Sequence, residues 1–307
     1  MVLGFGLSVL IGLKATMLFL CFAYLRSLGF MLLSVPFLYA SLVSLLISIA
    51  SHPSINLPML LGKNPDGSFP IWSLIMFSPY LYFVRIFSAL RRMRSGEPPY
   101  TEISEGIYVG GWPSSPDKLP PGDPAIIDCT CELPRKSEFS GMAYRCIPTW
   151  DTRSPQAAEI ESAIKWALRK RELNKPIFIH CAYGKLLELN AKSRGVLFTF
   201  LTSVGICSSL LLILGMTIAS EVKFCFPCKV EMQTFIGHGR SVAVMCALLV
   251  ALGIAEDWKN AEKLIKQKRP YIRMNSLHRE VLEEWSKHRL SVPKKKGEMA
   301  RSDSSSQ

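Results

Sequence analysis

Apolar positions dominate the first third of the chain, where the alternation typical of a soluble domain is missing. Three runs carry almost no charge: Val2–Leu25, which is broken only by Lys14, Gly29–Ala50 and Phe69–Leu90. A helix crosses the hydrocarbon core of a bilayer with about 20 apolar residues, and each run is that long. The pattern therefore predicts a membrane domain of about three transmembrane helices over residues 1–95.

Positive charges near these runs indicate their orientation. Arg26 lies between the first two runs, Arg91, Arg92 and Arg94 follow the third, and the loop 51–68 is nearly neutral. Because positive flanks face the cytosol, we expect an integral membrane protein with a lumenal N-terminus and a cytosolic domain after the third run. A cleaved signal peptide is the alternative for the first run. It fits poorly, since no basic segment precedes that run and two more follow.

Beyond a linker at Gly96–Pro99, the hydrophobic pattern becomes that of an α/β domain. Short β-branched runs alternate with segments of helical period, which predicts a parallel-rich sheet flanked by helices over residues 96–290. The tail 291–307 is basic and serine-rich, and we expect it to be disordered. The expected strands are Gly106–Trp112, Ala125–Cys129, Tyr144–Ile147 and Pro176–His180, and the expected helices are Gln156–Glu172, Ser241–Leu252, Glu256–Lys268 and Ser276–His288.

The composition of the chain limits the kinds of molecule that it is expected to bind. The net charge of +12 favours anionic neighbours such as acidic phospholipids or phosphorylated substrates. Nucleic acid is not expected, because the chain has no zinc-finger spacing and no basic-aromatic stripe. The nine cysteines are irregularly spaced and odd in number, so they indicate free thiols and no disulfide framework.

Two separated segments carry the chemistry. They are Ile177-Phe-Ile-His-Cys-Ala-Tyr-Gly184 and His238-Gly-Arg-Ser241. Joined, they form Cys-x5-Arg at a strand-to-helix turn, where successive backbone amides can surround one phosphate and the helix N-terminus favours its charge. The joined segment resembles the phosphate-binding loop of the protein-tyrosine and dual-specificity phosphatase superfamily.

The resemblance implies a role for each residue of the loop. Cys181 would be the nucleophile, Arg240 would hold two phosphate oxygens, and Asp151 of Trp150-Asp-Thr152 would be the general acid. The alternative for Asp151 is a cap on a helix that begins near Ser154. The family's chemistry implies no cofactor and no metal. The other residues expected to contact the phosphate are His180, Ala182, Tyr183, Gly184, His238, Gly239 and Ser241.

The resemblance covers roughly Thr101–His288. Glu105–Gly111 is similar to the family's entry strand, Ala125–Pro134 to its second strand and turn, and Lys268–Asn275 to its late Arg-Pro element. A second Cys-x5-Arg match, Cys129–Arg135, lacks glycine and contains a proline where an amide donor is needed. We interpret it as a strand end.

An insert of 53 residues, Lys185–Gly237, interrupts the loop. Within it, Val196–Ala219 has no charge for 24 residues and is a possible fourth span. If it spans, Cys181 and Arg240 lie on opposite faces of the bilayer. We interpret the insert as a translated retained intron, because its end codons can contain splice sites and its excision restores the loop. A genuine insertion carrying a membrane helix is the alternative.

The sequence therefore predicts a membrane-associated phosphomonoester phosphatase that works through a phospho-cysteine intermediate. Its substrate would be a phosphoprotein or a phospholipid, and the absence of lysine from the loop slightly favours phosphoprotein. The split loop leaves an inactive pseudo-phosphatase or an unproductive splice form as alternatives, and it predicts an inactive 307-residue chain. A sulfurtransferase, which also uses a cysteine in an anion-binding loop, is a weaker alternative.

Overall fold

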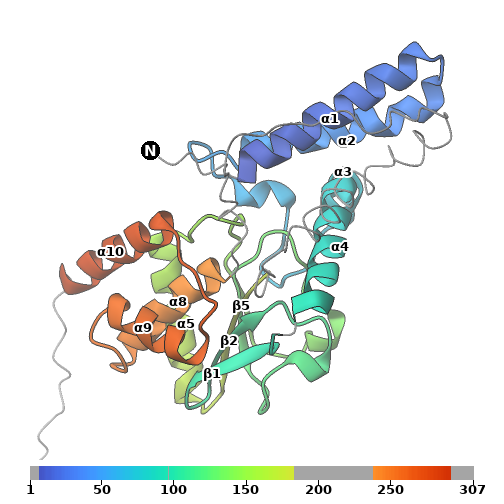
Figure 1. The fold of residues 1–307 in the computed structure, drawn as a ribbon. Helices are drawn as coiled ribbons and strands as arrows, with labels where there is room; N and C mark the ends of the chain where they lie inside the picture. The colour runs from blue at the N-terminus through green and yellow to red at the C-terminus, as the bar shows by residue number, and fades with distance from the viewer. Residues whose placement is uncertain (1–6, 96, 183–237, 292–307) are drawn as a thin grey trace, which may run out of the picture.

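The computed structural model describes residues 7–95, 97–182 and 238–291. The whole insert Lys185–Gly237, including the possible span Val196–Ala219, lies outside the described residues, as does nearly all of the predicted disordered tail. The N-terminal part is a hairpin of two long apolar helices, α1 (Leu7–Ser27) and α2 (Met31–Ala50), which projects from the rest of the molecule (Figure 1). In the described part of the chain, these two helices alone are long and apolar enough to cross a membrane.

A five-stranded mixed sheet forms the centre of the second domain. Its order is β1-β2-β5-β3-β4, and only the edge strand β1 runs antiparallel to its neighbour. The predicted α/β class and parallel-rich sheet are confirmed. The four predicted strands are all present, whereas β1 was not predicted. The strands are β1 (Tyr100–Ser104), β2 (Ile107–Gly111), β3 (Ala125–Asp128), β4 (Tyr144–Cys146) and β5 (Ile177–Cys181).

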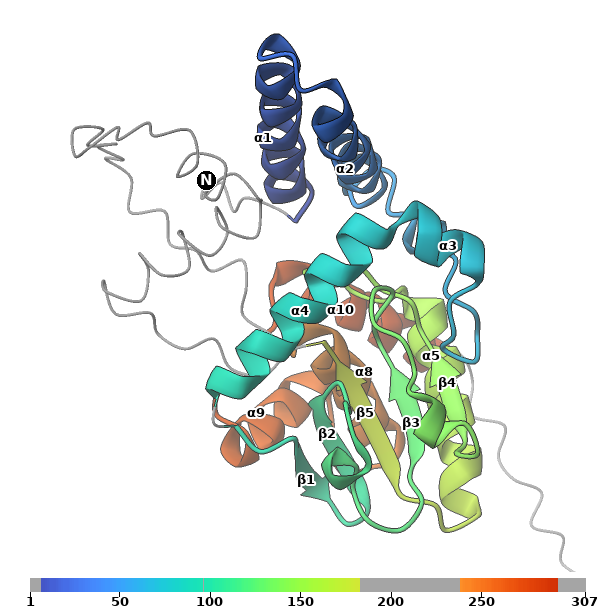
Figure 2. The same cartoon turned by 90° about the vertical axis from the view of Figure 1, so that its right-hand side faces the viewer.

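Four helices cover one face of this sheet (Figure 2). The central one, α8, is apolar on nearly every side and buried along almost its whole length, as expected for a helix enclosed by others. The opposite face is covered by loops with two short 3-10 helices, η2 (Pro116–Lys118) and η3 (Ser137–Phe139). The four helices are α5 (Ala157–Glu172), α8 (Gly239–Ala251), α9 (Trp258–Lys268) and α10 (Ser276–Ser291).

The third apolar run does not form the single span that its composition predicted. It is divided at Phe77 into α3 (Ile71–Met76) and α4 (Ser78–Ser95). Pro79 lies in the first turn of α4, where a missing backbone N–H is tolerated, so a new helix begins there. One face of α4 packs against the second domain, and the Tyr80 and Trp150 rings meet edge to face at 6.3 Å. Part of the run is therefore buried against protein, through Phe77, Tyr80, Leu81 and Val84.

The loop between α2 and α3 is fixed to the second domain. Its 3-10 turn η1 (Pro58–Leu61) precedes Lys63, which is 3% exposed and lies 2.7 Å from both Asp128 Oδ2 and the carbonyl oxygen of Thr130. The predicted lumenal position of this loop is therefore inconsistent with a cytosolic catalytic domain, because the two are in contact. If α1 and α2 cross a bilayer, they cross as a pair and return the chain to the side from which it started.

We expect glycosylation mapping to show this paired topology. Arg91, Arg92 and Arg94 after the hairpin outnumber Arg26 beside its turn, so in this topology the turn is lumenal. An acceptor tag fused ahead of Met1 and one placed after Gln307 should both remain unmodified, and a tag inserted at Gly29, in the turn between α1 and α2, should be modified. If the tag ahead of Met1 is modified while the Gln307 tag is not, the two ends lie on opposite sides of the membrane, and the three-span prediction would hold instead.

Candidate active site

The two halves of the predicted phosphate loop meet at the carboxyl end of β5. Cys181 is the last residue of this strand, and Ser241 in the first turn of α8 donates from Oγ to Cys181 Sγ over 3.3 Å. His238 caps α8 with a left-handed backbone (φ 78°) and accepts from Ser241 Oγ through its carbonyl oxygen. Cys181 and the first turn of α8, which carries Arg240, are therefore adjacent.

Close packing accounts for glycine at the start of α8. A Cβ at Gly239 would lie 2.5 Å from Cε1 of His278, which is buried behind the loop. Such an approach is too short for two carbon atoms, so a larger residue would displace either α8 or α10. Burial, together with the positive charge of Arg240, lowers the pKa of His278 to about 3. A neutral imidazole therefore supports the loop from behind.

The thiol of Cys181 is activated in this setting. The residue is 2% exposed, and burial alone would raise its pKa. Interactions with His238, Arg240 and Ser241 stabilise the thiolate more than burial opposes it, so the pKa of Cys181 falls from 9.0 to about 7. The other cysteines near the sheet edge differ, since burial raises the pKa of the Cys129 and Cys131 thiols well above the ordinary value. Among these three, Cys181 is the thiol suited to nucleophilic attack at neutral pH.

This difference predicts a pH dependence. Iodoacetamide reacts with thiolates, so the rate of Cys181 alkylation should rise with pH through a midpoint near 7. Because the folded pKa is depressed, the thiolate is already abundant at pH 7.5, where an ordinary thiol is still protonated. Mass spectrometry of the Cys181 peptide over pH 5–10 measures the midpoint, and a value near 9 would show that the thiol is not activated.

Arg240 is held by a residue that sequence reasoning did not select. Glu132 accepts from Arg240 Nη2 over 2.8 Å and from Nη1 over 3.1 Å, while the carbonyl oxygen of Thr149 also accepts from Nη1. Arg240 is 1% exposed, and a buried guanidinium requires such partners. Glu132 lies just after β3, at the same sheet edge as Cys181. In the sequence, Glu132 could have been identified as a candidate because it is an acidic residue that follows a buried strand.

Asp151 also lies beside the arginine. Its Oδ1 is 3.3 Å from Arg240 Nη2, and its side chain is 21% exposed, so it reaches the solvent edge of the site. The alternative role as a helix cap is wrong, because α5 begins with Gln156 as N-cap in a capping box with Glu159. Asn275 donates to the carbonyl oxygen of Thr152 over 2.8 Å and so fixes the loop that carries Asp151.

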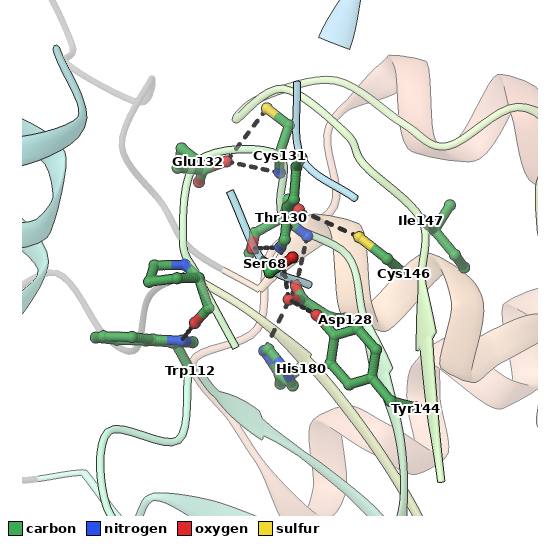
Figure 3. Close-up of polar contacts among 12 residues, drawn as sticks. Ser68, Trp112, Asp128, Thr130, Cys131, Glu132, Tyr144, Cys146, Ile147 and His180 are labelled. Carbon is green, nitrogen blue, oxygen red and sulfur yellow. Dashed lines mark hydrogen bonds and ion pairs between the residues drawn. The ribbon is translucent and has the colours of Figure 1, made fainter. Parts of the chain in front are cut away.

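His180 supports the loop from the strand side. Its Nδ1 lies 3.9 Å from Asp128 Oδ1, and both side chains are buried (Figure 3). Asp128 also accepts hydrogen bonds from Lys63 and Tyr144. Burial would raise the pKa of Asp128, but the charges of Lys63 and His180 outweigh it and lower the pKa to about 2. This carboxylate stays ionised and connects β3, β4 and the α2–α3 loop behind the nucleophile.

The remaining predicted residues are only partly described. Ala182 is buried and belongs to the apolar cluster that includes Trp150 and Tyr80. Tyr183 and Gly184 lie outside the described residues. The second Cys-x5-Arg match is a strand end, as predicted, because Cys129 directly follows β3. Its Arg135 donates to the carbonyl oxygens of Phe139 and Met142.

Comparison with known proteins gives the following. No family model and no curated protein sequence matches this chain. Solved phosphatase structures do match. Tk-PTP in its active form is 16% identical with a TM-score of 0.41, covering 62% of this chain and 97% of its own. Human DUSP28 is 12% identical with a TM-score of 0.41, covering 64% and 97%. PTPMT1 in complex with PI(5)P is 16% identical with a TM-score of 0.40, covering 62% and 96%. At these identities and scores, the activity of the chain has to be inferred from its own site.

Proposed function

We propose that this chain is a membrane-associated phosphomonoester phosphatase that works through a phospho-cysteine intermediate. The observation that carries the proposal is the contact of Ser241 Oγ with Cys181 Sγ at the N-terminus of α8, with Arg240 one residue away. A thiolate, a helix N-terminus and a buried guanidinium together form a site for a tetrahedral dianion next to a nucleophile. Membrane association rests on the hairpin of α1 and α2.

In the first step, the thiolate of Cys181 attacks phosphorus and the bond to the ester oxygen breaks. Asp151 donates its proton to that oxygen, so the leaving group departs as a neutral alcohol or phenol. Arg240 holds two of the phosphate oxygens as charge develops on them. Since Asp151 now contacts Arg240, substrate phosphate would replace this carboxylate on the guanidinium, while Glu132 keeps the arginine in place.

In the second step, water attacks the phosphorus of the phospho-cysteine. The Asp151 carboxylate accepts a proton from that water, the S–P bond breaks, and the electron pair returns to sulfur. The hydroxyl of Ser241, 3.3 Å away, stabilises the departing thiolate by donating a hydrogen bond. Inorganic phosphate leaves, and the site regains its starting protonation. Neither step requires a metal ion or an organic cofactor.

The substrate class is narrowed by the loop itself. The described parts of the loop carry one cation, Arg240, and no lysine, so a single phosphate group is the expected ligand. This favours a phosphoprotein over a multiply phosphorylated lipid headgroup, as the sequence suggested. A sulfurtransferase would not need Asp151 beside the loop arginine, which makes that alternative weaker.

Turnover tests the proposal directly. The split loop predicted an inactive 307-residue chain, but Cys181 and Ser241 are in contact, so we now expect that chain to hydrolyse p-nitrophenyl phosphate in EDTA. A variant lacking Lys185–Gly237 should do so faster because its cradle is continuous. Thiosulfate should not be a substrate of either form. Activity confined to the deletion variant would identify the insert-containing chain as a pseudo-phosphatase. Absence of activity from both forms would remove the proposed function.

A further inference from the structure

The segment that joins helix α4 to strand β1 reaches the active site through one buried carboxylate. Glu97 lies two residues after the end of α4, and its side chain is only 4% exposed. A carboxylate removed from water in this way has to be compensated by cations or hydrogen-bond donors. Its partners therefore indicate what the residue does.

Those partners are His238 of the phosphate loop and Arg269, which follows helix α9. Glu97 Oε2 lies 3.4 Å from Nε2 of His238 and 3.2 Å from Nη2 of Arg269. Arg269 Nη2 is itself 3.2 Å from His238 Nε2, so the three side chains meet at one point. Depending on the tautomer, Nε2 either donates to Glu97 or accepts from Arg269, and either bond restricts the position and the plane of the imidazole.

Arg269 anchors this group to the sheet. Nη1 donates to Thr101 Oγ1 over 2.8 Å and to the Val109 carbonyl oxygen over 3.4 Å, and Nη2 donates to the Pro98 carbonyl oxygen over 3.3 Å. The guanidinium therefore joins β1, β2 and the linker, and it follows α9 directly.

His238 is the residue through which this group can influence the nucleophile. It occupies a left-handed backbone position at the start of α8, and its side chain is buried. Its carbonyl oxygen accepts a hydrogen bond from Ser241 Oγ over 3.2 Å, the same hydroxyl that lies 3.3 Å from Cys181 Sγ, and the imidazole contributes to the lowered pKa of Cys181. The charged and titratable groups that face Cys181 come from three elements: His238 and Arg240 at the start of α8, Cys129 after β3, and Arg269 after α9. Glu97 contacts two of these four groups directly.

We propose that Glu97 is a positioning residue of this active site, which together with Arg269 orients His238 beside Cys181 and connects the end of α4 to the phosphate loop. The inference rests on the proposed function only in taking Cys181 as the nucleophile. Helix α4 packs against α2 of the apolar hairpin and carries Phe83, whose ring lies 3.9 Å from Lys14 Nζ.

The test is the pH dependence of Cys181 alkylation in the full chain, which requires no turnover. Glu97→Gln keeps the shape and removes the charge. A purely electrostatic role predicts a lower thiol pKa, because a nearby negative charge is lost. Positioning of His238 predicts a higher thiol pKa, with alkylation at pH 6.5 slowed about fivefold. Glu97→Asp, which retains the charge, should restore part of the rate, and Glu105→Gln on the exposed β1–β2 turn is the matched control.

If Glu97→Gln folds poorly, the same question can be tested with Glu97→Asp in a chain that also carries His238→Ala. In a His238→Ala chain, Glu97→Asp should have no further effect on the alkylation midpoint, since the residue through which Glu97 acts is absent. An unchanged or lower midpoint in Glu97→Gln, or an equal effect of Glu97→Asp with and without His238, would overturn the proposal. If the midpoint rises as expected while no variant hydrolyses a phosphate ester, the positioning role stands and the proposed phosphatase activity fails.

Discussion

Replacement of Cys181 by serine is expected to abolish hydrolysis of p-nitrophenyl phosphate, with a loss of at least about 10⁴-fold in kcat/KM. A serine hydroxyl has a far higher pKa than a thiol, and none of the groups that lower the pKa of Cys181 to about 7 can ionise it at neutral pH. The fold should be retained, since sulfur and oxygen differ little in size and Ser241 can donate to either.

Cys146→Ser is the matched control for this variant. Cys146 ends β4, is half-buried, and lies outside the phosphate loop, so its replacement should leave the rate near that of the parent chain. Rapid hydrolysis by Cys181→Ser, or an equal loss in Cys146→Ser, would exclude Cys181 as the nucleophile.

The second large effect concerns Asp151. Asp151→Asn should lower kcat by about 10²–10⁴-fold for substrates with poor leaving groups, because acid catalysis contributes in that range. The loss should be much smaller for p-nitrophenyl phosphate, since its leaving group departs without needing a proton. Alkylation of Cys181 should change little, because Asp151 contacts Arg240 and not the thiol.

Asp117→Asn is the control for charge removal. Asp117 is exposed in η2 and lies far from the loop along the chain, so its replacement by asparagine should leave kcat unchanged. Equal losses for phenyl and p-nitrophenyl phosphate in Asp151→Asn would indicate that Asp151 positions Arg240 and does not protonate the leaving group.

Much of the second domain could be predicted from the chain alone. Short β-branched runs and 3.6-residue periodicity placed four of the five strands and all four long helices, because burial imposes those patterns locally. The edge strand β1 was not predicted, because Tyr100–Ser104 is polar and only partly buried. Cys181, Arg240 and Asp151 were found through their order along the chain, and the structure brings them to one sheet edge.

The errors share one physical cause, which is long-range packing. The third apolar run was taken for a membrane span, yet its apolar face is buried against Trp150 and its neighbours. Hydropathy cannot distinguish burial in lipid from burial in protein. Glu132, Lys63 and Glu97 were missed because each acts on a partner at least 65 residues away, and local pattern carries no record of such pairs.

Rapid-quench mass spectrometry of the full chain tests the central claim most directly. During turnover of a phosphate monoester, a fraction of the chain should gain one phosphoryl group, and peptide mapping should place it on the sulfur of Cys181. Replacement of Ser241 by alanine should increase that fraction by slowing the second step. A turning-over chain with no phosphorylated peptide, or with the phosphoryl group on any other residue, would contradict the phospho-cysteine mechanism.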